Sequence, residues 1–228
     1  MSAAHQEVEP SDPGAGLADT GRLAAFCDAV FAIVITLLVL DLRVPDFHEG
    51  GLGAALRSEA PSFLAFVVSF IYVGVLWLNH HALLRLVRGT NLALNWINLA
   101  ILFGVVSIPF PTAVLAAALT EGDTHDLRVA VVLYAFAAAL MSAPWLVFFG
   151  YLRRHPALRA SHVSQDQVRV QEVRPITGLV LFGLTGLLGW LVHPLFGLIG
   201  VILMIIYHGV TSEGVHAGLL RRGPRRRG

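Results

Sequence analysis

Six stretches of the chain are apolar and of about the length needed to cross a bilayer, which takes roughly 17–25 residues. Their approximate bounds are 23–40, 62–81, 92–119, 129–151, 176–192 and 195–210. Only His193 and Pro194 separate the last two. Proline is tolerated in the first turn of a helix, so we expect a tight helical hairpin there. The pattern predicts an all-α integral membrane protein with six transmembrane helices per subunit, contained in residues 22–210.

Composition agrees with this interpretation and narrows the function. The chain is 56% hydrophobic and only 14% charged, whereas a soluble domain carries about 25% charged residues. Its single cysteine, Cys27, excludes an intrachain disulfide. The sequence has no HExxH or cysteine-rich zinc spacing and no recognisable Ser-His-Asp or Cys-His arrangement. We therefore expect neither an enzyme nor a resident metal or cofactor.

The arginines predict how the chain is oriented, and all sixteen basic residues are arginine. Six crossings place thirteen of them on one side of the membrane and three, Arg43, Arg57 and Arg128, on the other. Positive residues accumulate on the cytoplasmic side. We therefore expect a disordered cytoplasmic tail over residues 1–21 and a basic cytoplasmic tail over residues 211–228. Membrane lipid is an expected partner, and nucleic acid is not, because topology accounts for the arginines.

The first span has two different faces. Projected at 100° per residue, Leu37, Leu40 and Thr36 all fall within about 60° of Ile33. Asp28 falls about 140° from Ile33, on the other side of the helix. A carboxylate inside the membrane is costly, by roughly 2.5–3.5 kcal/mol on insertion scales. Asp28 therefore needs a polar partner from a neighbouring span.

The second and third spans offer such partners. The motif WLNHH contains Trp77, His80 and His81, and the third span adds Asn98. A buried structural network around Asp28 is the favoured interpretation, and a proton relay is the alternative. A metal site is less favoured still, because adjacent histidines on a helix point about 100° apart.

Two other segments affect the topology. The residues SIPFPT predict a kink or helix end at Pro109 and Pro111, because proline interrupts helical hydrogen bonding. The segment 152–175 mixes charged residues with scattered Val and Leu. It fits an interfacial segment and a solvated linker equally well.

The motifs of the first three spans resemble a known family. Arg22 followed by FCDAVFAIVITLLVL is similar to the R-x-x-x-F-S-D signature that opens the first span of the transmembrane protein 175 potassium channels. WLNHH and LNWINLAILFGVVSIPFPT resemble the second and third spans of that family. The second half of the chain matches only in hydropathy and span count.

The resemblance implies a potassium-permeable cation channel of a bacterial plasma membrane, built as a homotetramer because this chain has one six-span repeat. It implies a pore formed by the first helix around a four-fold axis. Ile33, Leu37 and Leu40 would make a hydrophobic constriction, Thr36 would be its polar contributor, and K⁺ would be the permeant ion.

The resemblance also assigns residues to a structural network behind the pore. They are Arg22, Phe26, Asp28, Trp77, His80, His81 and Asn98. One departure is Cys27, which stands at the family's serine position and is a weaker hydrogen-bonding group than a hydroxyl. The alternative function is a proton-leak pathway or secondary transporter that uses the Asp and His residues as carriers.

Overall fold

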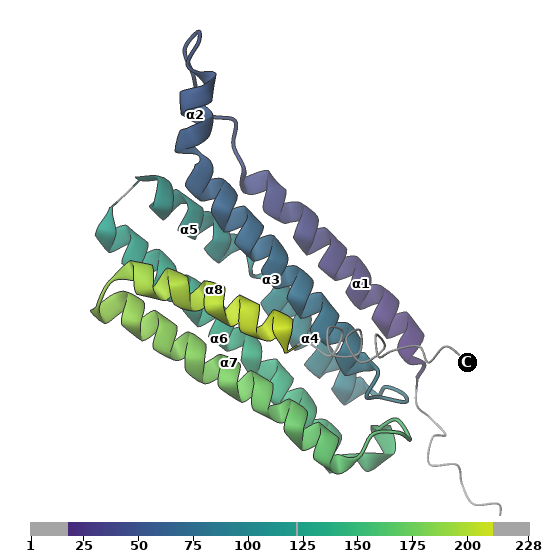
Figure 1. Ribbon diagram of the computed structural model, residues 1–228. Coiled ribbons are helices and arrows are strands. Elements are labelled where there is room, and N and C mark those ends of the chain that lie inside the picture. Colours follow the sequence, from purple (N-terminus) through teal and green to yellow (C-terminus); the bar gives the residue numbers. More distant parts are fainter. Residues whose placement is uncertain (1–17, 122, 212–228) are drawn as a thin grey trace, which may run out of the picture.

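The computed structural model describes residues 18–121 and 123–211. Nearly all of the two expected tails, residues 1–21 and 211–228, therefore lies outside the described residues. The elements are α1 (Thr20–Leu37), the 3₁₀ helix η1 (Leu38–Asp41), α2 (Leu52–Ser58), α3 (Ala60–Leu84), α4 (Leu92–Val106), α5 (Pro109–Glu121), α6 (Thr124–Arg154), the 3₁₀ helix η2 (Pro156–Leu158), α7 (Gln165–Leu191) and α8 (Pro194–Val210). The long helices run side by side, and α2 projects beyond one end of the bundle (Figure 1).

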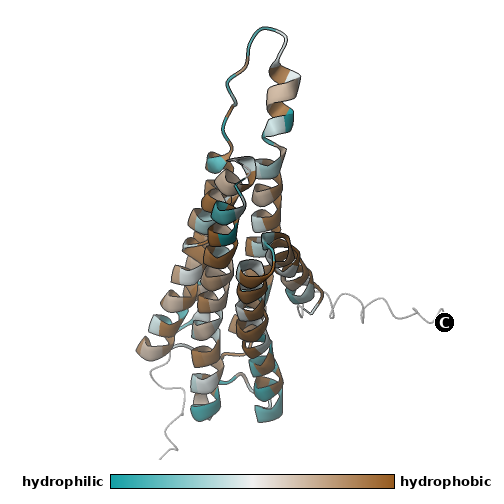
Figure 2. Ribbon diagram, turned by 90° about the vertical axis from the view of Figure 1, so that its left-hand side faces the viewer, coloured by the Kyte–Doolittle hydropathy of each residue, from teal (hydrophilic) through white to brown (hydrophobic). Residues whose placement is uncertain are grey.

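The lengths of the apolar helices confirm an all-α multi-pass membrane protein with roughly six spans. Among the described residues, five segments are long and apolar enough to cross a membrane: Thr20–Asp41, Ala60–Leu84, Leu92–Thr120, Thr124–Arg154 and Gln165–Leu191. The sixth apolar helix, α8, has 17 residues. At 1.5 Å per residue it is about 25 Å long, slightly less than the roughly 30 Å hydrocarbon core. Hydrophobic residues dominate the middle of the bundle, and hydrophilic residues gather towards its ends (Figure 2).

The segment SIPFPT ends one helix and begins the next, as its prolines predict. Helix α4 stops at Val106, and α5 begins at Pro109, where a missing backbone N–H costs nothing. The hydroxyls of Ser107 and Thr112 donate to the carbonyls of Phe103 and Ile108, both at 2.8 Å. The predicted third span is therefore two consecutive helices.

The start of α7 corrects the interpretation of residues 152–175. A solvated linker does not describe the second half of that stretch, because α7 begins at Gln165 and continues past Pro175. Ser164 caps it reciprocally with Gln167: the Gln167 N–H donates to the serine Oγ at 3.2 Å, and the Ser164 N–H donates to the glutamine Oε1 at 2.7 Å. The apolar pattern marks only the part of a helix that crosses the membrane, and the first turns of α7 are polar.

Short backbone bridges connect the loops at the arginine-rich end. Ala18 pairs with Thr90, with N–H···O distances of 2.9 and 3.0 Å, and Val87 pairs with Arg159. Ala18, two residues before α1, is thereby held to the α3–α4 connection. That connection is held in turn to the α6–α7 connection.

Small residues bring the α7–α8 hairpin close to α6. A Cβ atom at Gly197 would overlap Cγ1 of Val131 and lie 3.1 Å from Cα of Gly189. Gly183, on the exposed side of α7, has no other group within 4 Å of the same position. The two glycines therefore differ in whether a side chain fits.

Replacing Gly197 by alanine is expected to destabilise the protein by about 1–3 kcal/mol, because overpacking forces neighbouring side chains or backbone to shift. The thermal unfolding midpoint in detergent measures the effect. Gly183→Ala is the matched control and should leave the midpoint unchanged or slightly raised, since alanine favours the helix. Equal midpoints for the two variants would contradict close packing at Gly197.

Candidate functional site

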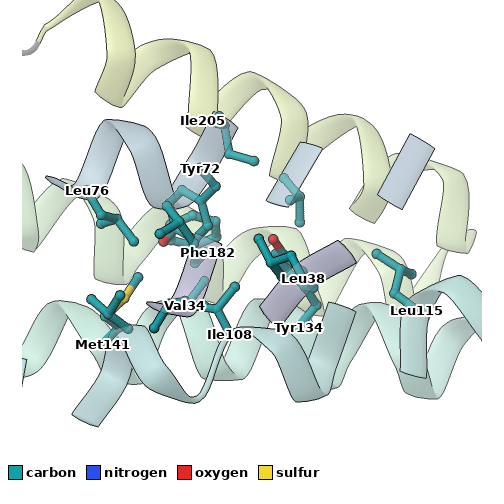
Figure 3. Close-up of a cluster of buried hydrophobic side chains, with 14 of the residues drawn as sticks. Val34, Leu38, Tyr72, Leu76, Ile108, Leu115, Tyr134, Met141, Phe182 and Ile205 are labelled. Carbon is teal, nitrogen blue, oxygen red and sulfur yellow. The ribbon is translucent and has the colours of Figure 1, made fainter. Parts of the chain in front are cut away.

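Helix α1 packs on the bundle with one face only. Cys27, Phe31, Val34 and Leu38 are each at most 1% exposed. Their spacing of four, three and four residues places them on one stripe of the helix. Val34 and Leu38 point into a core that also holds Tyr72 from α3 and Ile108 (Figure 3).

The opposite face of α1 is uncovered. Ile33 is 57% exposed, Leu37 41% and Leu40 72%. Thr36 is exposed between them, and its hydroxyl donates to the Ile33 carbonyl at 2.8 Å. The threonine proton is thus used within the helix, while the oxygen lone pairs remain on the exposed side. We refer to these four residues as the α1 face, in which Leu40 belongs to η1, the 3₁₀ continuation of α1.

Asp28 lies about 140° around the helix from Ile33 and bonds to a neighbouring helix. Its Oδ1 accepts a hydrogen bond from the indole N–H of Trp77 in α3 at 2.8 Å. The ring of His81 lies beside that indole, with 6.2 Å between ring centroids. Asp28 itself stays exposed, so Trp77 satisfies one of its oxygens and leaves the rest of the carboxylate uncovered by the chain.

A second set of contacts is fully buried and joins three helices. Asn98 of α4 accepts from Nε2 of His80 at 2.8 Å through its Oδ1, and its Nδ2 donates to the sulfur of Cys27 at 3.2 Å. Since the amide oxygen can only accept, the proton of the neutral imidazole lies on Nε2. Phe31 and Trp145 flank the His80 ring at centroid distances of 5.4 and 6.1 Å.

The structure therefore divides the residues of the expected network. Trp77 contacts Asp28, whereas His80 bonds to Asn98, and Asn98 in turn bonds to Cys27. Nε2 of His81 lies 3.1 Å from Arg85 on the exposed surface. Arg22 and Phe26 are exposed on α1, and among the described residues no hydrogen bond or ion pair joins Arg22 to Asp28.

A further polar cluster was not predicted from the sequence. Ser69 of α3 lies 2.8 Å from the Thr112 hydroxyl of α5 and 3.1 Å from the Tyr134 hydroxyl of α6. All three residues are at most 2% exposed. Ser69 lies three residues before the buried Tyr72, and Thr112 lies four residues after the buried Ile108. This helical spacing is the signal that could have placed these two hydroxyls in the core. In the described part of the chain, no group of His, Cys, Asp and Glu side chains is arranged to hold a metal.

Comparisons with known proteins agree with this geometry. Residues 22–109 match the family described as the endosomal/lysosomal potassium channel TMEM175. A Streptomyces collinus protein named as a potassium channel is 36% identical over 198 residues, covering 86% of this chain and 95% of that protein. The Mus musculus protein named as the endosomal/lysosomal proton channel TMEM175 is 36% identical over 135 residues, covering 54% of this chain and 27% of that protein.

A solved structure extends the likeness to the whole bundle. The crystal structure described as a lysosomal potassium-selective channel TMEM175 homologue from Chamaesiphon minutus matches with a TM-score of 0.72 and 32% identity. The match covers 85% of this chain and 97% of that one. These relatives are channels and not enzymes, and the family has potassium as its permeant ion. The sequence motifs, the helical bundle and near-complete coverage of the Streptomyces relative agree, and the chain belongs to the TMEM175 potassium channel family.

Proposed function

We propose that this chain is one subunit of a homotetrameric, potassium-permeable channel whose pore is lined by α1. The single observation that carries the proposal is that the chain leaves α1 uncovered both at the α1 face and at Asp28, which lies on another side of the helix. A carboxylate facing lipid is strongly disfavoured, so the uncovered part of α1 around Asp28 needs water or another subunit against it, and the apolar α1 face is then free to line a pore. Four subunits whose α1 helices surround a common axis supply both the water and the neighbouring subunit.

The α1 face has the chemistry of a hydrophobic gate. Four copies of Ile33, Leu37 and Leu40 form apolar rings that expel water, and with it ions, until the rings widen. The Thr36 oxygen, whose proton is held by the Ile33 carbonyl, presents its lone pairs to a passing cation. Potassium sheds water at lower cost than sodium, so partial dehydration favours it.

The residues behind the pore act in this proposal as positioning groups. The Asp28–Trp77 bond fixes the rotation of α1 relative to α3, and the contact of Asn98 with Cys27 fixes it relative to α4. Arg22, Phe26 and His81 have the same positioning role on the exposed side, where they face a neighbouring subunit. Interhelical hydrogen bonds of this kind contribute about 0.6–2 kcal/mol each in membranes.

The proposed setting is a bacterial plasma membrane, with both termini in the cytoplasm. Arginines at the ends of α3 and α6 and in the first turns of α7 lie at the bundle end that holds Ala18. The positive-inside rule assigns this end to the cytoplasm. In this arrangement residues 22–210 form the channel domain, and the segments 1–21 and 211–228 flank it.

The test is ion flux through purified protein in liposomes under equal gradients of potassium and then sodium. We expect rapid potassium-driven flux and slower sodium flux. Chemical crosslinking in the same liposomes should yield species up to the tetramer. Absence of flux for both ions, or a dimer as the largest crosslinked species, would overturn the proposal.

A proton pathway is the second candidate, favoured by the name of the Mus musculus relative. Asp28 and His80 are the titratable groups for it, and each has one hydrogen-bond partner on a neighbouring helix. Proton uptake in the same liposomes without a potassium requirement, abolished by His80→Gln while assembly persists, would favour this function. Proton movement unaffected by the variant would remove His80 as a carrier.

A further inference from the structure

A cavity of about 60 Å³ lies between α3, α6, α7 and α8, apart from the α1 face. Its apolar wall includes Leu76, Leu83 and Trp145, and its polar lining includes Asn79, Arg174 and His208. Arg174, Asn79 and Trp145 are each partly exposed, so the cavity is reached from outside the bundle. Helices α7 and α8 lie on the side of the bundle away from α1 (Figure 1). The cavity therefore faces the surrounding membrane and not the proposed pore.

The polar lining lies at a defined depth in the membrane. Arg174 is the last charged residue of α7 before the uncharged run 175–191. Asn79 and His208 lie near the C-terminal ends of α3 and α8, which meet α7 at that level. The arginine is thus at the boundary between hydrocarbon and headgroups, on the arginine-rich side of the protein.

The charges and donors of the cavity are complementary to an anion with hydroxyl groups. The guanidinium of Arg174 has five N–H donors, and one of them donates to the Thr211 carbonyl. Among the described residues the lining contains no carboxylate that would neutralise Arg174. Asn79 lines the cavity, and its side-chain oxygen has no hydrogen-bond partner in the described part of the chain. When its amide group turns towards the cavity, this oxygen can accept from a ligand hydroxyl.

We propose that this cavity binds an anionic phospholipid of the arginine-side leaflet. The phosphate lies against Arg174, a headgroup hydroxyl donates to Asn79, and the first part of one acyl chain lies against Leu76 and Trp145. A cavity of this volume cannot enclose a whole chain, so the remainder extends into the bilayer. The proposal needs only that the chain spans the membrane, and it stands apart from the pore assignment.

Tryptophan quenching tests this site directly, because Trp145 lines the cavity. Dibrominated phosphatidylglycerol and dibrominated phosphatidylcholine with identical chains are compared in vesicles that hold the full-length protein. Bromine quenches indole fluorescence on contact. We expect phosphatidylglycerol to reach half-maximal quenching at about fivefold lower mole fraction, the preference expected of one arginine near the surface. The Trp145→Phe variant should lose the preferential part of the quenching.

Two arginine variants separate a specific site from general surface charge. Arg174→Gln should abolish the fivefold preference, and Arg174→Lys should restore part of it. Arg169→Gln removes an equally charged but exposed residue of α7 that does not line the cavity, and it should leave the preference intact. Equal loss in the Arg169 and Arg174 variants, or a preference that survives Arg174→Gln, would overturn the proposal. The proposal would also be overturned if either lipid quenches only after residues 212–228 are removed, because that segment would then be the occupant of the cavity.

Discussion

Replacing Ile33 by asparagine is expected to raise ion flux by about tenfold and to bring sodium flux close to potassium flux. The reason is that an amide on the α1 face keeps water in the ring that Ile33 otherwise dries. In the proposed tetramer four copies act together, so a gain of only about 0.35 kcal/mol per subunit lowers the barrier by about 1.4 kcal/mol, which is tenfold in rate. The measurement is potassium and sodium flux in liposomes at equal protein density.

The matched control for this variant is Ile199→Asn in α8. Ile199 is 53% exposed, close to the 57% of Ile33, but it lies on a helix away from α1 (Figure 1). The control should keep wild-type flux and selectivity if it elutes as wild type does. Unchanged conductance and selectivity in Ile33→Asn would remove Ile33 from the constriction. An equal rise in Ile199→Asn would point to a leak caused by polar substitution in general.

The two faces of α1 could be predicted from the sequence because a single period governs them. Ile33, Thr36, Leu37 and Leu40 repeat at three and four residues, and a helix places that spacing on one side whatever it packs against. Which side would be buried depends on the partners. The buried stripe through Cys27 and Phe31 is equally apolar, so hydropathy alone could not assign it to the core.

The choice between His80 and His81 shows what the sequence left open. Both follow Trp77 closely, and the motif WLNHH does not distinguish them. The buried positions of α3 distinguish the two histidines, because the buried stripe through Tyr72 and Leu76 continues to His80. His81 points about 100° away from that stripe. His80 is accordingly 1% exposed. A helical projection of the second span, like that of the first, would have favoured His80.

Other features depend on tertiary packing that no local pattern encodes. Ser69, Thr112 and Tyr134 come from three helices and meet only once the bundle has formed. The polar first turns of α7 form a helix because Ser164 caps them and because Arg153 of α6 pairs with Glu172 at 2.9 Å. Hydropathy identifies the lipid-facing part of a helix and does not indicate where the helix begins.

Replacing Asn98 by leucine is expected to destabilise the protein by roughly 1–3 kcal/mol, the cost of leaving a buried donor unsatisfied. Nε2 of His80 would lose its acceptor at a position where the ring is 1% exposed. Asn95→Leu is the matched control on the same helix. The side-chain oxygen of Asn95 is buried without a hydrogen-bond partner in the described part of the chain, so this change should be neutral or stabilising. Thermal unfolding midpoints in detergent compare the two variants.

A double variant distinguishes a lost hydrogen bond from a simple misfit of leucine. If Asn98→Leu is harmful because it strands the imidazole, then His80→Leu in the same chain removes the stranded group and should recover part of the loss, since removing both partners costs less than removing one. If leucine is merely too large or misshapen beside Cys27 and Phe31, the two losses should add, because each substitution then brings its own packing strain. Additive losses would therefore exclude the His80–Asn98 bond as the reason that Asn98 stabilises the contact between α1, α3 and α4. A recovery would identify that bond as part of what holds α1, the proposed pore-lining helix, in register.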